Sequence, residues 1–230
     1  MQALIFDCDG VLVDTERDGH RVAFNKAFAN KGLAENWSVE RYGELLHTAG
    51  GKERMRRHFE ETEWPVPVAD RDEFIKGLHK AKTDLFMDLI LEGELPLRPG
   101  IDRVVDEAIA AGVTLAVCST SNERAVQSVV DVLLGPDRSK HITVFAGDVV
   151  AAKKPDPAVY QLALEKLNLD SMKCVVVEDS HIGMTAALGA GIRCIVTKSS
   201  YTRNEDFSGA SSIVDDLGAI YLKDLDGLRV

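Results

Sequence analysis

The sequence predicts an α/β protein, with a parallel β-sheet covered by helices on both faces and an all-helical insert. Short apolar runs, typical of buried parallel strands, alternate with helical patterns along most of the chain. Residues from about 15 to 95 break this alternation and contain helical patterns without a convincing strand. The 230 residues are 45% hydrophobic, enough for one large domain or a main domain with a smaller insert.

The predicted elements follow from runs of apolar residues and from helix signals. We expect strands at Ala3–Phe6, Thr114–Cys118, Ile142–Ala146, Cys174–Val177 and Arg193–Val196. We expect helices between them at Ile101–Ala111, Glu123–Leu134, Pro157–Leu167 and Met184–Ala190. The helical stretches of the insert are Arg21–Asn30, Val39–Leu46, Lys52–Glu61 and Asp72–Leu91. The expected division is therefore a core of residues 1–14 and 96–230 and a helical domain of residues 15–95.

Charge and composition exclude several classes of protein. The net charge of −10 argues against a nucleic-acid binder, which normally has a basic surface. The same field would repel an anionic substrate, so local cations or a metal would have to bind it. No apolar run is long enough to span a membrane. We expect no membrane or nucleic-acid partner, and a monomer.

The pattern of cysteines indicates the redox state of the compartment in which the protein works. Cys8, Cys118, Cys174 and Cys194 each lie in or beside an apolar run and form no CxxC pair. Buried, reduced thiols in a reducing compartment are the favoured interpretation. No targeting segment precedes the first predicted strand, but a transit peptide removed earlier would leave no trace, so the compartment stays open.

Polar residues follow the predicted strands where open α/β sheets bind ligands. Asp7 and Asp9 follow the first strand, Ser119 to Asn122 the second, Lys153 and Lys154 lie beyond the third, and Glu178 and Asp179 end the fourth. Two carboxylates at i and i+2 can flank one reacting centre, one attacking phosphorus while the other transfers protons. Grouping Asp7, Asp9 and Asp179 favours a hard cation such as Mg²⁺.

The remaining groups suit phosphoryl transfer. Ser119, at a predicted helix N-terminus, can donate to phosphoryl oxygens, and Lys154 can neutralise charge in the transition state. Each signal is weak by itself, because such residues are usually turn formers, helix caps or surface charges. Their ordered appearance, each just after an apolar strand, is poorly explained by chance.

These residues resemble four motifs of the haloacid dehalogenase superfamily. The motifs are Phe6–Thr15, Val117–Ser119, Lys154–Pro157 and Val177–Ser180, and the resemblance covers essentially the whole chain. It implies a Rossmann-like core with a helical cap inserted after the first motif. It also implies Asp7 as nucleophile and metal ligand, and Asp9 as general acid/base with its carbonyl on Mg²⁺. Asp179 would bind the metal, Glu178 would support that site, and Ser119 and Lys154 would hold the phosphoryl group.

The insert contains an unusually basic segment, residues 47–58. Gly50 and Gly51 lead into a helix that carries Lys52 and Arg54, which makes a second anion site facing the first credible. The alternative is a solvated basic helix face. For Arg56 and Arg57, an anion-binding role and a solvated surface are about equally good explanations. Glu16 and His20, four residues apart, could line the mouth of the site, but plain surface residues are as good an explanation.

Two anion sites suit a sugar bisphosphate. Segments 14–21, 50–54, 118–123 and 145–150 resemble the CbbY-type xylulose-1,5-bisphosphate phosphatases of photosynthetic eukaryotes. This resemblance implies removal of the phosphate on carbon 1 of a Rubisco inhibitor, giving xylulose 5-phosphate, and a plastid-stroma or cytoplasmic location. It makes these residues substrate-contact candidates: Glu16, His20, Gly51, Lys52, Arg54, Ser119 and Asn122.

Three alternatives remain open at the level of the sequence. A β-phosphoglucomutase-like enzyme would share the fold, the motifs and the cap, and would return its phosphoryl group to a reoriented intermediate. A non-catalytic sugar-phosphate binding module would not need both Asp7 and Asp9 at a reacting centre. A broad phosphoglycolate-type phosphatase would show no preference for bisphosphates.

Overall fold

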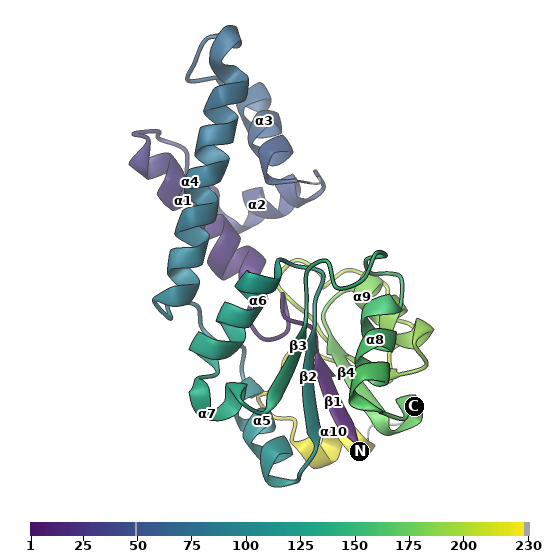
Figure 1. Cartoon of the computed structure of the whole chain (residues 1–230). Coiled ribbons are helices and arrows are strands. Elements are labelled where there is room, and N and C mark those ends of the chain that lie inside the picture. Colours follow the sequence, from purple (N-terminus) through teal and green to yellow (C-terminus); the bar gives the residue numbers. More distant parts are fainter. Residues whose placement is uncertain (49, 228–230) are drawn as a thin grey trace. The chain divides into compact units, whose positions relative to one another are not determined.

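A six-stranded parallel β-sheet forms the core of the computed structural model, which describes residues 1–48 and 50–227 (Figure 1). Its strands are β1 (Ala3–Phe6), β2 (Thr114–Cys118), β3 (Ile142–Phe145), β4 (Cys174–Glu178), β5 (Arg193–Thr197) and β6 (Ser212–Val214). Their order is β3-β2-β1-β4-β5-β6, and every neighbouring pair is parallel. The predicted parallel α/β fold is confirmed, with the first strand of the chain at the centre.

Helices cover both faces of this sheet. They are α5 (Ile101–Ala110), α6 (Glu123–Ser128), α7 (Pro136–Ser139), α8 (Ala158–Leu167), α9 (His181–Gly189) and α10 (Leu222–Gly227). Ala3 and Ile5 of β1 pack in one buried cluster with Tyr160 of α8 and Met184 of α9. Because side chains alternate along a strand, the equally buried Leu4 and its even-numbered neighbours face the other side, where α5 contacts β2.

Some elements differ from the sequence-based expectation. The helix predicted over 123–134 is α6 followed by a π-helical turn, η3 (Val129–Leu133). The third strand ends at Phe145 rather than at Ala146. Strand β6 was not predicted, because its three residues include two apolar side chains without a readable period. Helices α7 and α10 were missed for the same reason, since four and six residues are too few to show a helical repeat.

By contacts between Cα atoms, the chain forms two compact units, Glu16–Glu92 and the remainder. The first unit contains α1 (Arg21–Asn30), α2 (Val39–Leu46), α3 (Gly51–Glu61), η2 (Val68–Asp70) and α4 (Arg71–Leu91), after the π-helical turn η1 (Thr15–His20). Its described residues include no strand. Phe24, Phe28, Trp37 and Phe59 are buried and contact one another in a chain of aromatic rings, which gives this unit a hydrophobic core of its own.

The cysteines are free and buried, as predicted. Burial raises the pKa of each of these thiols, so their reactive thiolate forms are suppressed. Within residues 1–48 and 50–227, none of the helices has the length and apolar character that crossing a bilayer requires.

Arg98 joins distant parts of the larger unit through its guanidinium group. It donates to the carbonyl oxygen of Gly10, to both oxygens of Thr197 at 3.1 Å, and to the carbonyls of Lys198 at 2.7 Å and Asp215 at 2.6 Å. The loop after β1 and the segment after β5 are therefore tied to one charged group. These charge-assisted bonds also satisfy carbonyls outside the sheet.

Gly100, at the start of α5, should tolerate substitution by a larger residue poorly. Its φ is +84°, and a Cβ there would lie 2.1 Å from the Leu217 carbonyl oxygen. Gly100→Ala should lower the free energy of unfolding by about 3 kcal/mol, from left-handed backbone strain together with overpacking. Gly112→Ala is the matched control, because Gly112 has a φ of +67° with nothing within 4 Å. It should lose only about 1 kcal/mol. Equal losses in urea unfolding would contradict the steric explanation.

Candidate active site

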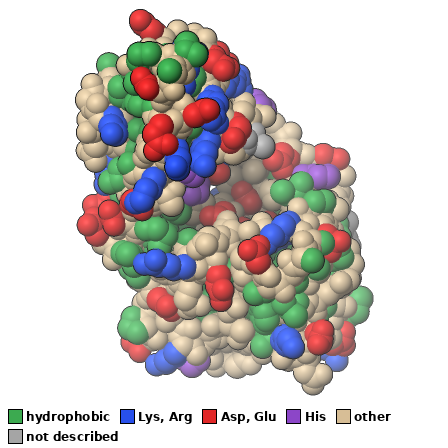
Figure 2. All heavy atoms as spheres, turned by 45° about the horizontal axis from the view of Figure 1, so that its top comes forward, with side chains coloured by type: hydrophobic (Ala, Val, Ile, Leu, Met, Phe, Trp, Pro, Cys, Tyr) green, Lys and Arg blue, Asp and Glu red, His purple; other side chains and the backbone are tan. Residues whose placement is uncertain are grey.

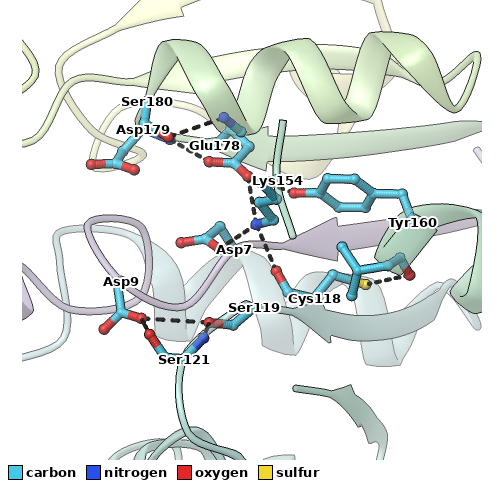
Figure 3. Close-up of polar contacts among 12 residues, drawn as sticks. Asp7, Asp9, Cys118, Ser119, Ser121, Lys154, Tyr160, Glu178, Asp179 and Ser180 are labelled. Carbon is cyan, nitrogen blue, oxygen red and sulfur yellow. Dashed lines mark hydrogen bonds and ion pairs between the residues drawn. The ribbon is translucent and has the colours of Figure 1, made fainter. Parts of the chain in front are cut away.

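A buried ion-pair cluster lies at the carboxyl ends of β1, β2 and β4 (Figure 3). The Nζ atom of Lys154 donates to Asp7 Oδ1 at 2.5 Å, to Glu178 Oε1 at 2.7 Å and to the Cys118 carbonyl at 2.9 Å. The side chain of Lys154 is only 6% exposed. Because all three ammonium protons have acceptors, the lysine holds the ends of three strands together, and it places its charge beside Asp7.

Three carboxylates in this cluster are close enough to hold one metal ion. An oxygen from each of Asp7, Glu178 and Asp179 lies within 4.8 Å of the other two, and all three residues are buried. The set consists only of carboxylate oxygens, which are the ligands that hard divalent cations prefer. Glu178 is further oriented by Tyr160, whose hydroxyl donates to its Oε1 at 2.6 Å, and by the Asp179 backbone N–H at 3.2 Å from its Oε2.

The electrostatics of the cluster support a cation site. Burial raises the pKa of Asp7 to about 8, although the Lys154 ammonium opposes that shift. Burial and the Glu178 and Asp7 carboxylates also raise the pKa of Asp179 well above its usual range. Although burial alone would lower the pKa of Lys154, the two neighbouring carboxylates hold it well above the ordinary lysine value. One lysine therefore does not offset the cost of gathering these acids, and a divalent cation would.

Asp9 belongs to a separate group of contacts. Its Oδ1 accepts from the Thr15 hydroxyl at 2.7 Å, and its Oδ2 accepts from Ser121 at 2.5 Å and from Ser119 at 3.5 Å. These donors fix the orientation of a carboxyl group that is partly exposed and does not contact Lys154 in the described contacts. Asp7 and Asp9 thus occupy different environments, one paired with a lysine and the other held by hydroxyls, as two carboxylates with different tasks require.

Two glycines make room for the acids. A Cβ on Gly10, whose φ is +83°, would lie 2.1 Å from Asp179 Oδ2, and a Cβ on Gly183 would lie 2.1 Å from Glu178 Oε1. Gly183 is in the first turn of α9, which Ser180 caps by accepting from its N–H at 3.2 Å. The carboxylates therefore pack directly against backbone at both places.

The second group of predicted site residues lies in the Glu16–Glu92 unit. Glu16 Oε2 accepts from the Tyr42 hydroxyl at 2.5 Å and lies 3.8 Å from Arg54, which donates to the same hydroxyl at 3.1 Å. His20 contacts Lys82 in the same unit. The structure thus brings Glu16 and Arg54 together through Tyr42, which the sequence analysis did not single out.

The remaining basic residues of α3 fall into two classes. Lys52 is exposed at the helix start, next to Gly51, whose missing Cβ would lie 2.9 Å from His79 Nε2. Arg56 instead pairs with Asp72 at 2.7 Å, and Arg57 with Glu61 at 2.6 Å. These pairs favour a structural role for both arginines. On the face in Figure 2, Lys and Arg side chains lie among Asp and Glu side chains rather than forming one unbroken basic surface.

The sequence analysis assigned no individual role to several residues of the site. Thr15, in the first motif, and Ser121, in the hydroxyl cluster after the second strand, orient Asp9. Tyr160, which orients Glu178, had no readable signal in the sequence. Asn122, by contrast, caps α6 by accepting from the Ala125 N–H at 3.3 Å. The helix-cap explanation therefore holds for Asn122, and a substrate contact would be additional to it.

Known proteins share this arrangement. The family model for haloacid dehalogenase-like hydrolases matches residues 1–191. A CBBY-like protein from Arabidopsis thaliana is 58% identical over 94% of this chain and 69% of its own length. The CbbY protein of Cereibacter sphaeroides is 43% identical, covering 96% of this chain and 94% of that protein.

A solved structure extends the comparison to the fold. It is a mutant of CbbY from Rhodobacter sphaeroides in complex with xylulose 1,5-bisphosphate, with a TM-score of 0.76 and 41% identity, covering 98% of this chain and 99% of that one. The likeness covers nearly the whole of both chains, so the two proteins share the fold described above. The chain therefore belongs to the haloacid dehalogenase-like hydrolases, and within that family it is a phosphatase of the CbbY type.

Proposed function

We propose that this enzyme is a Mg²⁺-dependent phosphatase that converts xylulose 1,5-bisphosphate to xylulose 5-phosphate through an aspartyl-phosphate intermediate on Asp7. The observation that carries the proposal is the Asp7 carboxylate, buried among acids and 2.5 Å from the Lys154 ammonium. A bisphosphate bound to a CbbY mutant 41% identical to this chain supports the choice of substrate. We also propose that the enzyme works as a monomer in the plastid stroma or the cytoplasm and has no membrane partner. The net charge of −10 supports the absence of a nucleic-acid partner.

The residues present fit a magnesium ion. Asp7, Asp179, Glu178 and the main-chain carbonyl of Asp9 would hold it, and the bound ion would neutralise the acids and the phosphoryl oxygens. Lys154 supplies a second, permanent positive charge at the reacting carboxylate. Ser119, whose backbone N–H bonds to the Phe145 carbonyl at 3.0 Å, presents its hydroxyl from a fixed loop for a phosphoryl oxygen.

The reaction then divides between the two aspartates. An Asp7 oxygen attacks the phosphorus of the phosphate group on carbon 1. The bond from phosphorus to the sugar oxygen breaks, and Asp9 gives that oxygen a proton. In the second half, Asp9 takes a proton from water as the water oxygen attacks the phosphorus of the aspartyl phosphate. Inorganic phosphate leaves and Asp7 is regenerated. Thr15 and Ser121 hold Asp9 for both steps.

We assign recognition of the rest of the substrate to the Glu16–Glu92 unit, as a cap domain corresponding to the predicted residues 15–95. Lys52 and Arg54 would bind the second phosphate, with the start of α3 at Gly51 adding backbone N–H groups. Glu16 and His20 would contact sugar hydroxyls or phosphate, and Asn122 would add a contact from the core. The Tyr42 hydroxyl, which bonds both Glu16 and Arg54, keeps these two groups in one place.

A phosphate-release screen over sugar mono- and bisphosphates with Mg²⁺ tests the reaction. Xylulose 1,5-bisphosphate should give the highest kcat/KM, at least about tenfold above phosphoglycolate and β-glucose 1-phosphate, because one further charged contact is worth about that factor. Formation of glucose 6-phosphate from β-glucose 1-phosphate, primed with glucose 1,6-bisphosphate and without matching phosphate release, would identify a mutase instead. Binding without turnover of any ester would identify a binding module.

Replacing the nucleophile tests the covalent step. Asp7→Asn should lower kcat by at least about a thousandfold, because the amide cannot attack phosphorus. Calorimetric binding of xylulose 1,5-bisphosphate with Mg²⁺ should remain measurable. Asp137→Asn is the control, since that carboxylate is 98% exposed and pairs with Lys140 on the surface; it should keep wild-type turnover. Substantial turnover in Asp7→Asn would disprove the assigned nucleophile.

The second phosphate site can be tested at Lys52. Lys52→Ala should raise KM for xylulose 1,5-bisphosphate by about tenfold, the value of one charge-assisted contact, with little change for one-phosphate substrates. Lys76→Ala removes another exposed lysine of the same unit, 3.6 Å from Glu73, and should change neither value. Equal losses for bisphosphates and monophosphates in Lys52→Ala would rule out a second anion site at this lysine.

A further inference from the structure

Lys82 is a buried lysine in α4 for which the reaction described above has no role. It is 7% exposed, and its Nζ atom lies 2.7 Å from His20 Nδ1. The ammonium group also lies 4.9 Å from the centre of the Phe24 ring and 5.1 Å from that of Phe86. An apolar side chain would fill the same space without the desolvation cost of a charge, so packing alone does not account for a lysine here.

His20, the hydrogen-bonding partner of Lys82, is also packed against its neighbours. The His20 imidazole lies against the Phe86 ring with 3.9 Å between the ring centres, so Phe86 contacts both members of the pair. His20 ends η1, the turn that also carries Glu16. The imidazole therefore cannot reorient without disturbing the lysine, the phenylalanine and the start of α1.

The charges around the pair determine which group carries the proton. Burial lowers the pKa of His20 well below its ordinary value, and the Lys82, Arg54 and His79 side chains act in the same direction. Burial lowers the pKa of Lys82 to about 8, with the Glu16 carboxylate opposing that shift and Arg54 adding to it. At pH 7 the lysine is therefore mainly an ammonium group and the histidine a neutral ring.

The hydrogen bond then has only one direction. An ammonium group has three donors and no acceptor, so Lys82 donates and His20 Nδ1 accepts. In a neutral imidazole, a nitrogen that accepts leaves the proton on the other nitrogen. We propose that Lys82 is a positioning residue that fixes His20 as a neutral imidazole with its proton on Nε2, so that His20 offers the substrate a donor without a charge.

This inference rests on the proposed function, in which His20 contacts the substrate, and it adds the form in which His20 does so. Lys52 and Arg54 supply the charge that attracts a phosphate. A neutral N–H donor beside them contributes direction and keeps its protonation state across the neutral pH range. Without Lys82, the neutral imidazole would be free to place its proton on either nitrogen, and each tautomer would present a different group to the substrate.

The tautomer can be read by long-range ¹H–¹⁵N NMR correlation in the whole protein labelled with ¹⁵N-histidine. The His20 signals are assigned by their loss in His20→Gln. The wild type should show the Nε2–H tautomer with no titration between pH 6 and 8. In Lys82→Met, which keeps an unbranched chain, His20 should become a mixture of the two neutral tautomers, because no ammonium group then requires Nδ1 to accept. Lys80→Met is the control, because Lys80 is exposed on the same helix and pairs with Asp84 at 2.7 Å.

Kinetics separate this inference from the function on which it rests. Lys82→Met should raise KM for xylulose 1,5-bisphosphate by about tenfold with a smaller change in kcat. A wild-type His20 protonated on Nδ1, or a Lys82→Met variant with an unchanged His20, would overturn the inference whatever the enzyme hydrolyses. The expected tautomers without hydrolysis of any bisphosphate would overturn the proposed function and leave the placement of the proton intact.

Thermal unfolding checks that the variant is folded. Folding lowers the pKa of Lys82 from 10.5 to about 8, so between these pH values the unfolded chain binds more protons than the folded protein. The free energy of unfolding of the wild type therefore decreases as the pH falls from 10.5 to about 8. Lys82→Met should therefore have the higher Tm at pH 7, and its advantage over the wild type should shrink between pH 8 and 10.5. A lower Tm at pH 7 would show that Lys82 serves stability, and would overturn the inference.

Discussion

The core of this enzyme depends on one lysine that bonds two carboxylates at once. Lys154 meets Asp7 at the end of β1 and Glu178 at the end of β4, and the two strands are adjacent and parallel, so their last residues reach the same edge of the sheet. Tyr160, Gly10 and Gly183 all serve this arrangement, one by donating to Glu178 and two by leaving space for carboxylates. The burial of these acids beside one lysine therefore depends on the pairing of β1 with β4.

Among its buried and half-buried charged groups, the helical unit has more cations than acids, the opposite of the acid cluster in the core. There the buried or half-buried groups include Lys82 and Arg54, and Glu16 is the acid that approaches Arg54 at 3.8 Å. Aromatic rings surround these cations: Phe24 and Phe86 lie near Lys82, and Tyr42 lies 5.7 Å from the Arg54 guanidinium carbon. In a chain with a net charge of −10, these cations are the local positive charges that the proposed binding of an anionic substrate would use.

The sequence was most informative where a residue follows a buried strand. The positions of Asp7, Lys154, Glu178 and Asp179 could be inferred because apolar runs announce parallel strands, and the carboxyl ends of such strands meet at one edge. The sheet order, including the edge strand β6, left no such trace, because three residues carry no period. Tyr42, Tyr160 and Lys82 could not be singled out either. Their importance lies in contacts with residues far along the chain, such as Lys82 with His20, 62 residues away. The ion pairs of Arg56 with Asp72 and of Arg57 with Glu61, by contrast, favour a structural role for these two arginines.

The central place of β1 has a consequence for the order in which the chain can acquire structure. Ribosomal synthesis delivers β1 first, yet both of its neighbours, β2 and β4, come after the whole helical unit has been made. Residues Glu16–Glu92 are contiguous and have their own aromatic core, so all their partners exist early. The ion pair of Asp7 can form only after Lys154 has been synthesised, 147 residues later. The nascent protein can thus complete its helical unit while the strand that leads into Asp7 is still unpaired.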